Sequence, residues 1–193
     1  MAKEPIEKLL SSAHTGNCEA RYKIGQFYYS GLGVTQDYEQ AKNWFLLAAT
    51  GGHQDAQFSL GWLYHVGLGV DPDANVARDW YELAAQQGHK EAQFQLGRLY
   101  SFSLRNDALS AEWYTKSAEQ GHCRAMCRLG WIFHLGLGVT KSDEKALYWL
   151  HLSANKGNAA AQASIGDMYR NGWGVEKDLD MANYWMRRAK GLA

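Results

Sequence analysis

The stretch AQFSLGWLYHVGLGVDPDANVARDWYELAAQQGHKE, residues 56–91, carries the pattern that decides the fold. Residues 125–160 read AMCRLGWIFHLGLGVTKSDEKALYWLHLSANKGNAA, so glycines, aromatics and alanines return at the same places. The register extends in both directions with a period of 36 residues that the third repeat shortens by three, giving repeats at 20–55, 56–91, 92–124, 125–160 and 161–193. Tandem units of this length predict a solenoid in which each unit packs on its neighbours.

Each repeat opens with a predicted helix in which an aliphatic residue, a glycine and an aromatic residue recur, as in Leu60, Gly61 and Tyr64. A glycine inside a helix costs about 1 kcal/mol against alanine, so its recurrence indicates that a neighbouring helix packs where a side chain would clash. In four repeats a Gly-Leu-Gly-Val or Gly-Trp-Gly-Val turn ends this helix. The predicted N-caps of the second helices are Asp37, Asp73, Asn106, Ser142 and Asp178.

The second helix of each repeat carries one tryptophan, which we assign to the core: Trp44, Trp80, Trp113, Trp149 and Trp185. It stops at a Gly-His or Gly-Asn pair, so His53, His89 and His122 are predicted to be turn residues. Residues Glu4 to Ala13 match the end of such a helix, with Lys8 in the tryptophan's place, so residues 1–19 should form an N-terminal capping helix. We therefore predict one all-α domain over residues 1–193, a right-handed superhelical solenoid of antiparallel helix pairs.

Charge and composition exclude several classes of partner. The 20 Lys and Arg residues balance the 20 Asp and Glu residues, which leaves no broad field to hold nucleic acid or anionic lipid. No stretch approaches the about 18 apolar residues of a membrane span, and residues 1–17 lack the features of a secretory signal. The three cysteines are an odd number, which does not suggest a disulfide framework. We expect a cytoplasmic protein that binds neither nucleic acid nor membrane.

The motif A-x-x-x-L-G-x-x-Y-x-x-G-x-G-V-x-x-D-x-x-x-A-x-x-W-x-x-x-A-A-x-x-G-H, nearly whole in residues 56–89, resembles the Sel-1-like repeat, a relative of the tetratricopeptide repeat. The resemblance covers residues 20–193, and the third repeat departs from it where residues 101–106 replace the Gly-x-Gly turn. It implies an adaptor or scaffold that binds another protein without catalysis or a cofactor. Bacterial members of the family include immunity proteins that neutralise secreted toxins, which is an alternative function.

Positions that vary between repeats are free to specify a ligand, because the recurring residues serve self-packing. Counting the starting alanine as the first position, the third, seventh and tenth positions share one face of the first helix. In tetratricopeptide-like solenoids this face lines the concave groove, where we expect a peptide or partner helix to bind. The predicted binding residues are Tyr22, Gln26, Tyr29, Phe58, Trp62, His65, Phe94, Arg98, Trp131, His134, Asp167 and Arg170. Ser101, Cys127 and Ala163 complete the pattern.

Two interpretations of this face stay open. Tyr22, Phe58 and Phe94 recur so regularly that packing under the next repeat explains them as well as a groove does. Trp62 and Trp131 are the preferred anchors, because the residues at their position in the other repeats are polar or charged types that are rarely buried unpaired.

Metal and catalytic sites are not expected. His65 and His134 lie two repeats apart, at least ~16 Å at ordinary helix spacings, so one ion cannot bind both. We expect each to bond a ligand or to be solvated. His122, Cys123 and Cys127 supply three zinc ligands without a fourth, which makes a poor structural site. No nucleophile, base and orienting acid can be assembled from repeat-equivalent positions.

Two further possibilities follow from the sequence, one an enzyme and the other a self-associating protein. A hydrolase acting on cell-wall or β-lactam compounds is a lower-ranked alternative, because the cysteine-rich relatives with that activity carry paired cysteines that this chain lacks. The other is a weak homo-oligomer, since an open solenoid ends in exposed helix faces that can stack.

Overall fold

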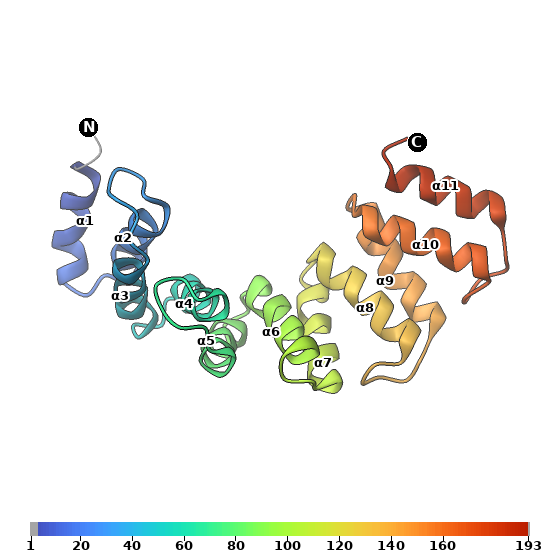
Figure 1. Ribbon diagram of the computed structural model, residues 1–193, viewed down its shortest axis with the longest axis horizontal. Helices are drawn as coiled ribbons and strands as arrows, with labels where there is room; N and C mark the ends of the chain where they lie inside the picture. Colours follow the sequence, from blue (N-terminus) through green and yellow to red (C-terminus); the bar gives the residue numbers. More distant parts are fainter. Residues whose placement is uncertain (1–3, 193) are drawn as a thin grey trace. The chain divides into compact units, whose positions relative to one another are not determined.

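The computed structural model describes residues 4–192, and these form eleven α-helices and no strand (Figure 1). The all-α solenoid of helix pairs is confirmed. The first helix is α1 (Glu4–His14), and the five pairs that follow are α2 (Cys18–Ser30) with α3 (Tyr38–Ala49), α4 (Gln54–Val66) with α5 (Ala74–Gln86), α6 (Lys90–Phe102) with α7 (Asp107–Glu119), α8 (Cys123–Leu135) with α9 (Asp143–Asn155), and α10 (Ala159–Asn171) with α11 (Leu179–Ala189). Within residues 4–192, none of these helices combines the length and the hydropathy that crossing a membrane requires.

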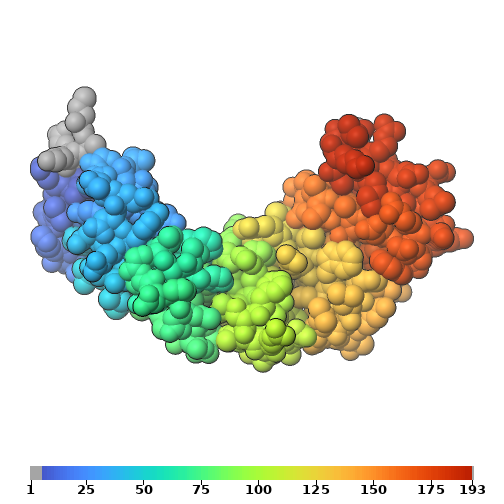
Figure 2. Space-filling model, viewed as in Figure 1, coloured from blue at the N-terminus to red at the C-terminus, as the bar shows by residue number. Residues whose placement is uncertain are grey.

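The chain divides into two compact units, Met1–Ala92 and Gln93–Ala193, with the boundary inside α6. In each unit a helix packs mainly against the helices that precede and follow it in sequence. Successive segments therefore form successive bands of surface within each unit (Figure 2). Contacts between neighbouring helices are the only way such a unit can bury its apolar side chains.

The recurring glycine of each first helix faces a large side chain of the second helix. A Cβ on Gly61 would lie 2.5 Å from the ring of Tyr81, and one on Gly25 would lie 2.5 Å from the ring of Phe45. Real Cβ atoms do not approach carbon this closely, so no residue but glycine lets the two helices pack at this separation. This is the neighbouring-helix packing that the glycine pattern predicts.

The assignment of all five tryptophans to the core is wrong. Trp44, Trp80, Trp113 and Trp149 are half-buried, and Trp185 alone among the five is buried, at 6% exposure. In four repeats the residue after the tryptophan fills the core against the glycine, and those residues are Phe45, Tyr81, Tyr114 and Leu150. Consecutive residues of a helix point about 100° apart, so only one of the two can face the helix's own partner.

Two of the half-buried tryptophans, Trp44 and Trp80, pack against a second core that preceding helices help to form. Trp44 packs against the cluster formed by Ala13, Ala20 and Ile24, which lies between α1 and α2. Trp80 packs in the same way against the cluster of α2–α4 residues that includes Phe45. The second helix thus serves two cores, which the single tryptophan pattern does not reveal.

The two glycines of the turn are required for different structural reasons. Gly67 ends α4 in the left-handed conformation, with φ 81°, and its N–H donates to the carbonyl of Leu63. Gly69 lies directly on the start of α3 in the preceding repeat, where a Cβ would come within 2.7 Å of the backbone of Tyr38. The second glycine therefore lets one repeat rest its turn on the backbone of another.

The five predicted N-caps of the second helices are confirmed, each side-chain oxygen accepting from a backbone N–H of the first turn. The backbone N–H of the capping residue donates to the backbone carbonyl of the recurring aromatic residue in the first helix. Asp73 donates in this way to the carbonyl of Tyr64 at 2.9 Å. The short third repeat keeps this bond, from Asn106 to Tyr100 at 2.8 Å. Its tighter turn places Arg105 at φ 50°, the one non-glycine residue with positive φ among those the structure describes.

Candidate functional site

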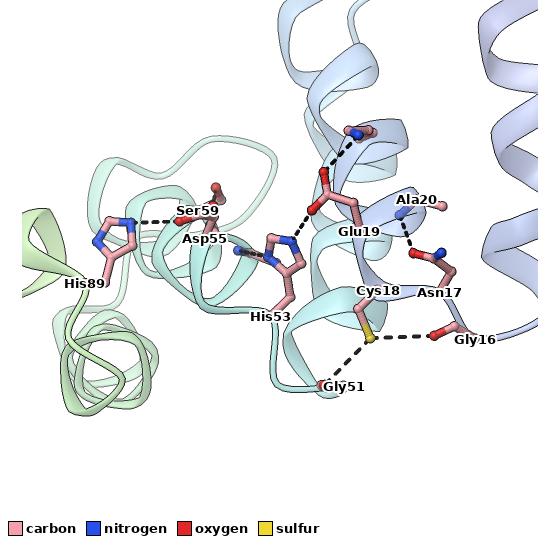
Figure 3. Close-up of polar contacts among 12 residues, drawn as sticks. Gly16, Asn17, Cys18, Glu19, Ala20, Gly51, His53, Asp55, Ser59 and His89 are labelled. Atoms are coloured by element: carbon pink, nitrogen blue, oxygen red, sulfur yellow. Dashed lines mark hydrogen bonds and ion pairs between the residues drawn. The ribbon is translucent and has the colours of Figure 1, made fainter.

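Histidines begin the first helices of three repeats, and each one joins two repeats. Nδ1 of His89 accepts a hydrogen bond from the N–H of Ala92 at 3.1 Å, which caps α6. The same ring stacks on Phe58, with centroids 4.7 Å apart, and its Nε2 lies 3.1 Å from a carboxylate oxygen of Asp55 (Figure 3). The sequence pattern predicts that this histidine is a turn residue and does not reveal either contact with α4.

The contacts recur one repeat earlier. His53 caps α4 by accepting from Ala56, and its ring stacks on Tyr22 with centroids 4.6 Å apart. Its Nε2 bonds Glu19 at 2.9 Å, and this bond is the main reason that the pKa of the Glu19 carboxyl lies below its ordinary value (Figure 3). An aromatic ring and a carboxylate of one first helix therefore both contact the histidine that caps the next first helix.

These stacks show where the three recurring aromatics of the predicted face lie. His122 covers Phe94 with centroids 4.5 Å apart, as the earlier histidines cover Tyr22 and Phe58. All three rings thus pack under the next repeat, which is one of the two interpretations left open by the sequence. Phe94 is 3% exposed, whereas Tyr22 and Phe58 are half-buried.

The unit Met1–Ala92 holds six of the predicted binding residues. Gln26 is exposed and Tyr29 is half-buried with its ring edge against Tyr38. Trp62 and His65 are half-buried and lie nearly parallel, with centroids 6.2 Å apart and planes at 21°. Together with Tyr22 and Phe58, these side chains make the α2 and α4 part of the predicted face.

The unit Gln93–Ala193 brings three of the predicted residues to one pocket. Phe94, Arg98 and Trp131 line an open pocket of about 480 Å³ between α6, α8 and the start of α10. The remaining lining residues are Arg124, Cys127, Arg128, Asn158 and Ala160. The indole Nε1 of Trp131 donates to Oγ of Ser164 at 3.0 Å, which holds this wall against α10.

His134 is not solvated, contrary to the expectation from sequence. It is 8% exposed, and its Nδ1 lies 2.6 Å from a carboxylate oxygen of Asp143 at the start of α9. Trp173 from the next repeat's turn covers the ring, with centroids 4.5 Å apart. The histidine therefore joins α8, α9 and the following turn, which its neighbourhood in the sequence could not show.

Asp167 and Arg170 of α10 lie outside the pocket lining and pair with each other at 3.2 Å. Asp167 is half-buried and Arg170 is exposed. An exposed pair of this kind contributes little to stability, so its two side chains are available to a ligand.

Four of the pocket residues were missed, namely Arg124, Arg128, Asn158 and Ala160. The signal was present, because Arg128 stands at a position that holds Lys, Ser or Gln in the other repeats. Arg124 stands where three repeats have an acid. These positions vary between repeats as clearly as the position of Trp131 does. They lie beside the third, seventh and tenth positions on the helix, so the predicted face did not include them.

The cysteines do not gather with other ligands. Among residues 4–192 no three His, Cys, Asp or Glu side chains lie close enough together to hold a metal ion. Cys127 is buried, and burial raises the pKa of its thiol. A raised thiol pKa lowers the thiolate fraction at neutral pH, which disfavours nucleophilic chemistry at this residue.

The Sel1 repeat model matches residues 18–53, 54–89, 90–122, 123–158 and 159–190. Each match starts at the first residue of a first helix. A segment of 46 residues, 23% of this chain, is 48% identical to an ERAD-associated E3 ubiquitin-protein ligase component of Arabidopsis thaliana and spans 7% of that protein.

Solved structures share the whole fold. A protective antigen present in uropathogenic Escherichia coli strains matches 95% of this chain with a TM-score of 0.90 and 35% identity, and the match spans 40% of the antigen. A Sel1 repeat protein from Oxalobacter formigenes also gives 0.90, with 33% identity over 97% of this chain and 78% of its own. An immunity protein from Pseudomonas aeruginosa has the same fold at 18% identity, with a TM-score of 0.59 over 97% of this chain and 72% of its own.

Helix pairs and capping residues recur five times, the family model matches five consecutive repeats, and a solved Sel1 repeat protein matches 97% of the chain. The chain belongs to the Sel1 repeat family.

Proposed function

We propose that this chain is a non-catalytic adaptor or scaffold that binds a peptide segment or a partner protein on the face of its first helices. Sel1 repeats generally mediate protein–protein interaction. The observation that carries the proposal is the makeup of the face, where Trp62, Arg98 and Trp131 occupy one variable position and are all partly exposed. Tryptophan and arginine dominate the binding energy of many protein interfaces.

The pocket in the unit Gln93–Ala193 supports the same proposal. Its lining combines aromatic surface from Phe94 and Trp131 with several hydrogen-bond donors. A concave site with apolar walls and a few polar groups is typical of ligand binding.

The three free thiols, Cys18, Cys123 and Cys127, suit the reducing cytoplasm, in which we propose that the protein works.

A pull-down from the native cell's lysate tests the proposal. The wild type is compared with the double variant Trp62→Ala/Trp131→Ala, and circular dichroism checks that both are folded. We expect the wild type to retain a specific partner and the double variant to lose it, because each substitution removes a large part of the exposed aromatic surface of the face.

The matched control removes two aromatic side chains from second helices. Tyr148 and Tyr184 are exposed, at 60% and 46%, on α9 and α11. Tyr148→Ala/Tyr184→Ala should therefore keep the partner. Equal loss in both double variants, or full retention in both, would contradict the assignment of binding to the first-helix face.

A narrower version of the proposal is an immunity protein that neutralises a secreted toxin. The likeness to the Pseudomonas aeruginosa immunity protein extends to the fold and motivates the experiment. Co-expression with the captured partner decides between the versions. An immunity protein should restore growth to cells that the partner kills, whereas an adaptor should leave growth unchanged.

A further inference from the structure

The junction between the fourth and fifth repeats departs from the rule that joins the earlier ones. On α2 and α4 an acid in the first turn pairs with the next histidine, as Glu19 does with His53 and Asp55 with His89. On α8, Arg124 stands at the position of the acid. Asn158 replaces the histidine that would follow. The charge at this position is thus reversed, and its histidine partner is absent.

The same junction also loses its ring stack. Cys127 occupies the position of Tyr22, Phe58 and Phe94, so a small side chain stands where the other repeats have an aromatic ring. Asn158 still caps α10, because its Oδ1 accepts from the N–H of Ala161 at 3.1 Å. Three substitutions therefore keep the helix cap and remove the side chains that fill this space elsewhere. The 480 Å³ pocket is lined by all three of the substituted residues.

Positive charge collects in this space. Arg98, Arg124 and Arg128 all line the pocket, and its lining contains no carboxylate. Asn158 and Ala160 belong to the start of α10, where free backbone N–H groups add positive potential. The whole chain has a formal charge of zero, so this concentration is local.

The arginines are placed for a ligand. Arg98 donates to Oε1 of Gln95 at 3.0 Å, and the guanidinium of Arg124 lies 4.7 Å from the centroid of Phe94. Arg128 is exposed on α8, one helical turn after Arg124, and no carboxylate of residues 4–192 pairs with it. Guanidinium groups on two helices can thus approach one bound group from two sides.

A buried hydroxyl lies beside this cluster. Tyr114 is 2% exposed, its ring packs on Phe94, and its hydroxyl has no hydrogen-bond partner. Burial raises the pKa of this hydroxyl to about 12, against the opposing effect of the nearby charges of Arg128 and Arg98. A neutral hydroxyl without a hydrogen-bond partner therefore lies near the charges of Arg128 and Arg98.

We propose that this pocket binds the carboxylate of an aspartate or glutamate side chain in an acidic segment of a partner protein. Planar guanidinium groups match carboxylates in geometry and charge. The walls formed by Phe94 and Trp131 suit the methylene stem of such a side chain and an apolar neighbour beside it. The inference rests on the proposed interaction function and names the chemistry of the segment that is bound.

Calorimetric titration with defined peptides tests the proposal. The probe is a pentapeptide with blocked ends, phenylalanine at its centre and glutamate at every other position. Matched probes carry glutamine or phosphoserine in place of glutamate. We expect the glutamate peptide to bind and to weaken with added salt, and Arg128→Gln to reduce its affinity at least about tenfold. Arg187→Gln on α11 removes a similar charge outside the pocket and should leave the affinity unchanged.

A second variant refills the space and restores the acid at the position of Arg124. Arg124→Glu, Cys127→Phe and Asn158→His together restore the acid, ring and histidine of the second repeat. This triple variant should stay folded by circular dichroism and lose the glutamate peptide. A native circular dichroism spectrum shows that such a loss does not come from unfolding.

The outcomes separate this inference from the proposed function. Binding of the glutamate peptide that Arg128→Gln weakens at least about tenfold and the refilled variant abolishes supports a carboxylate site. Equal binding of the glutamine peptide, tighter binding of the phosphoserine peptide, or binding that survives in the refilled variant overturns it. If the refilled variant also keeps the partner captured from lysate, the pocket assignment fails while the interaction function stands. If the wild type captures no partner, the interaction function fails.

Discussion

The imidazole of His89 lies face to face with the phenyl ring of Phe58, with centroids 4.7 Å apart and planes at 17°. The stack takes the imidazole out of water, and this desolvation lowers the pKa of His89 although the nearby Asp55 acts to raise it. The neutral ring is also the form that can cap α6, because Nδ1 must accept from the N–H of Ala92. Packing and capping therefore favour the same protonation state.

Acid should weaken the wild type through this histidine. The folded-state pKa of His89 lies below the unfolded value near 6.5, so the unfolded state binds more protons. The stabilisation is complete above about pH 6.5 and is lost as the pH falls toward the folded pKa. We compare urea midpoints with those of His89→Asn, which keeps a capping oxygen and does not titrate. The wild-type midpoint should fall relative to the variant between about pH 7 and 5. Parallel profiles would show that His89 does not carry the effect.

The core glycines should differ in their tolerance of alanine. Gly61→Ala places a Cβ 2.5 Å from the rigid ring of Tyr81 and should lower the free energy of unfolding by about 1–3 kcal/mol. Gly166→Ala is the matched control, because its nearest contacts are longer, at 3.1 Å to the carbonyl oxygen of Ala182 and 3.1 Å to the flexible Met186. Alanine's helix propensity, about 1 kcal/mol over glycine, should then leave Gly166→Ala near neutral. Chemical denaturation measures both, and equal costs would contradict the packing argument.

The bond between Trp131 and Ser164 should contribute to the stability of the pocket wall. Trp131→Phe and Ser164→Ala each remove it, and each should cost about 1 kcal/mol. The double variant should cost less than the sum by about 0.5–1 kcal/mol, because the same bond is lost only once. A double-mutant cycle from thermal denaturation measures this coupling, and strict additivity would mean that the bond contributes nothing.

The left-handed residue in the short turn offers a stabilising change. Arg105 is exposed and has φ 50°, a region that costs roughly 1–2 kcal/mol for a residue with a Cβ. Arg105→Gly should raise the free energy of unfolding by up to about 1 kcal/mol, since glycine's greater freedom in the unfolded chain offsets part of the relief. Arg105→Ala removes the same charge and keeps the strain, so it should not be stabilising.

The residues that serve local geometry were predictable from sequence. Asp73 and Gly67 act within a few residues of themselves, so spacing and residue type suffice to place the cap and the helix end. Gly61 was also interpretable, because a recurring glycine in a helix needs a close neighbour. The role of Trp80 was not predictable from sequence. A helix with two buried faces carries apolar residues on both faces, and the sequence does not say which face packs against which repeat.

The candidate site was predictable in part. Phe94, Arg98 and Trp131 follow from helical spacing on one face, and the structure brings them together. Arg124 and Asn158 belong to different repeats, and their meaning depends on a contact between an acid and the following histidine that is seen in three dimensions. His134 shows the same limit, because Asp143 and Trp173 reach it from other helices and turns.

The histidine at the end of one repeat also caps the first helix of the next, so a single residue serves two repeats. A fragment ending at Gly88 would contain both helices of the second repeat and still leave the ring of Phe58 without its cover. Recombined arrays of these repeats should therefore be joined inside helices, where each histidine keeps both the ring that it covers and the helix that it caps.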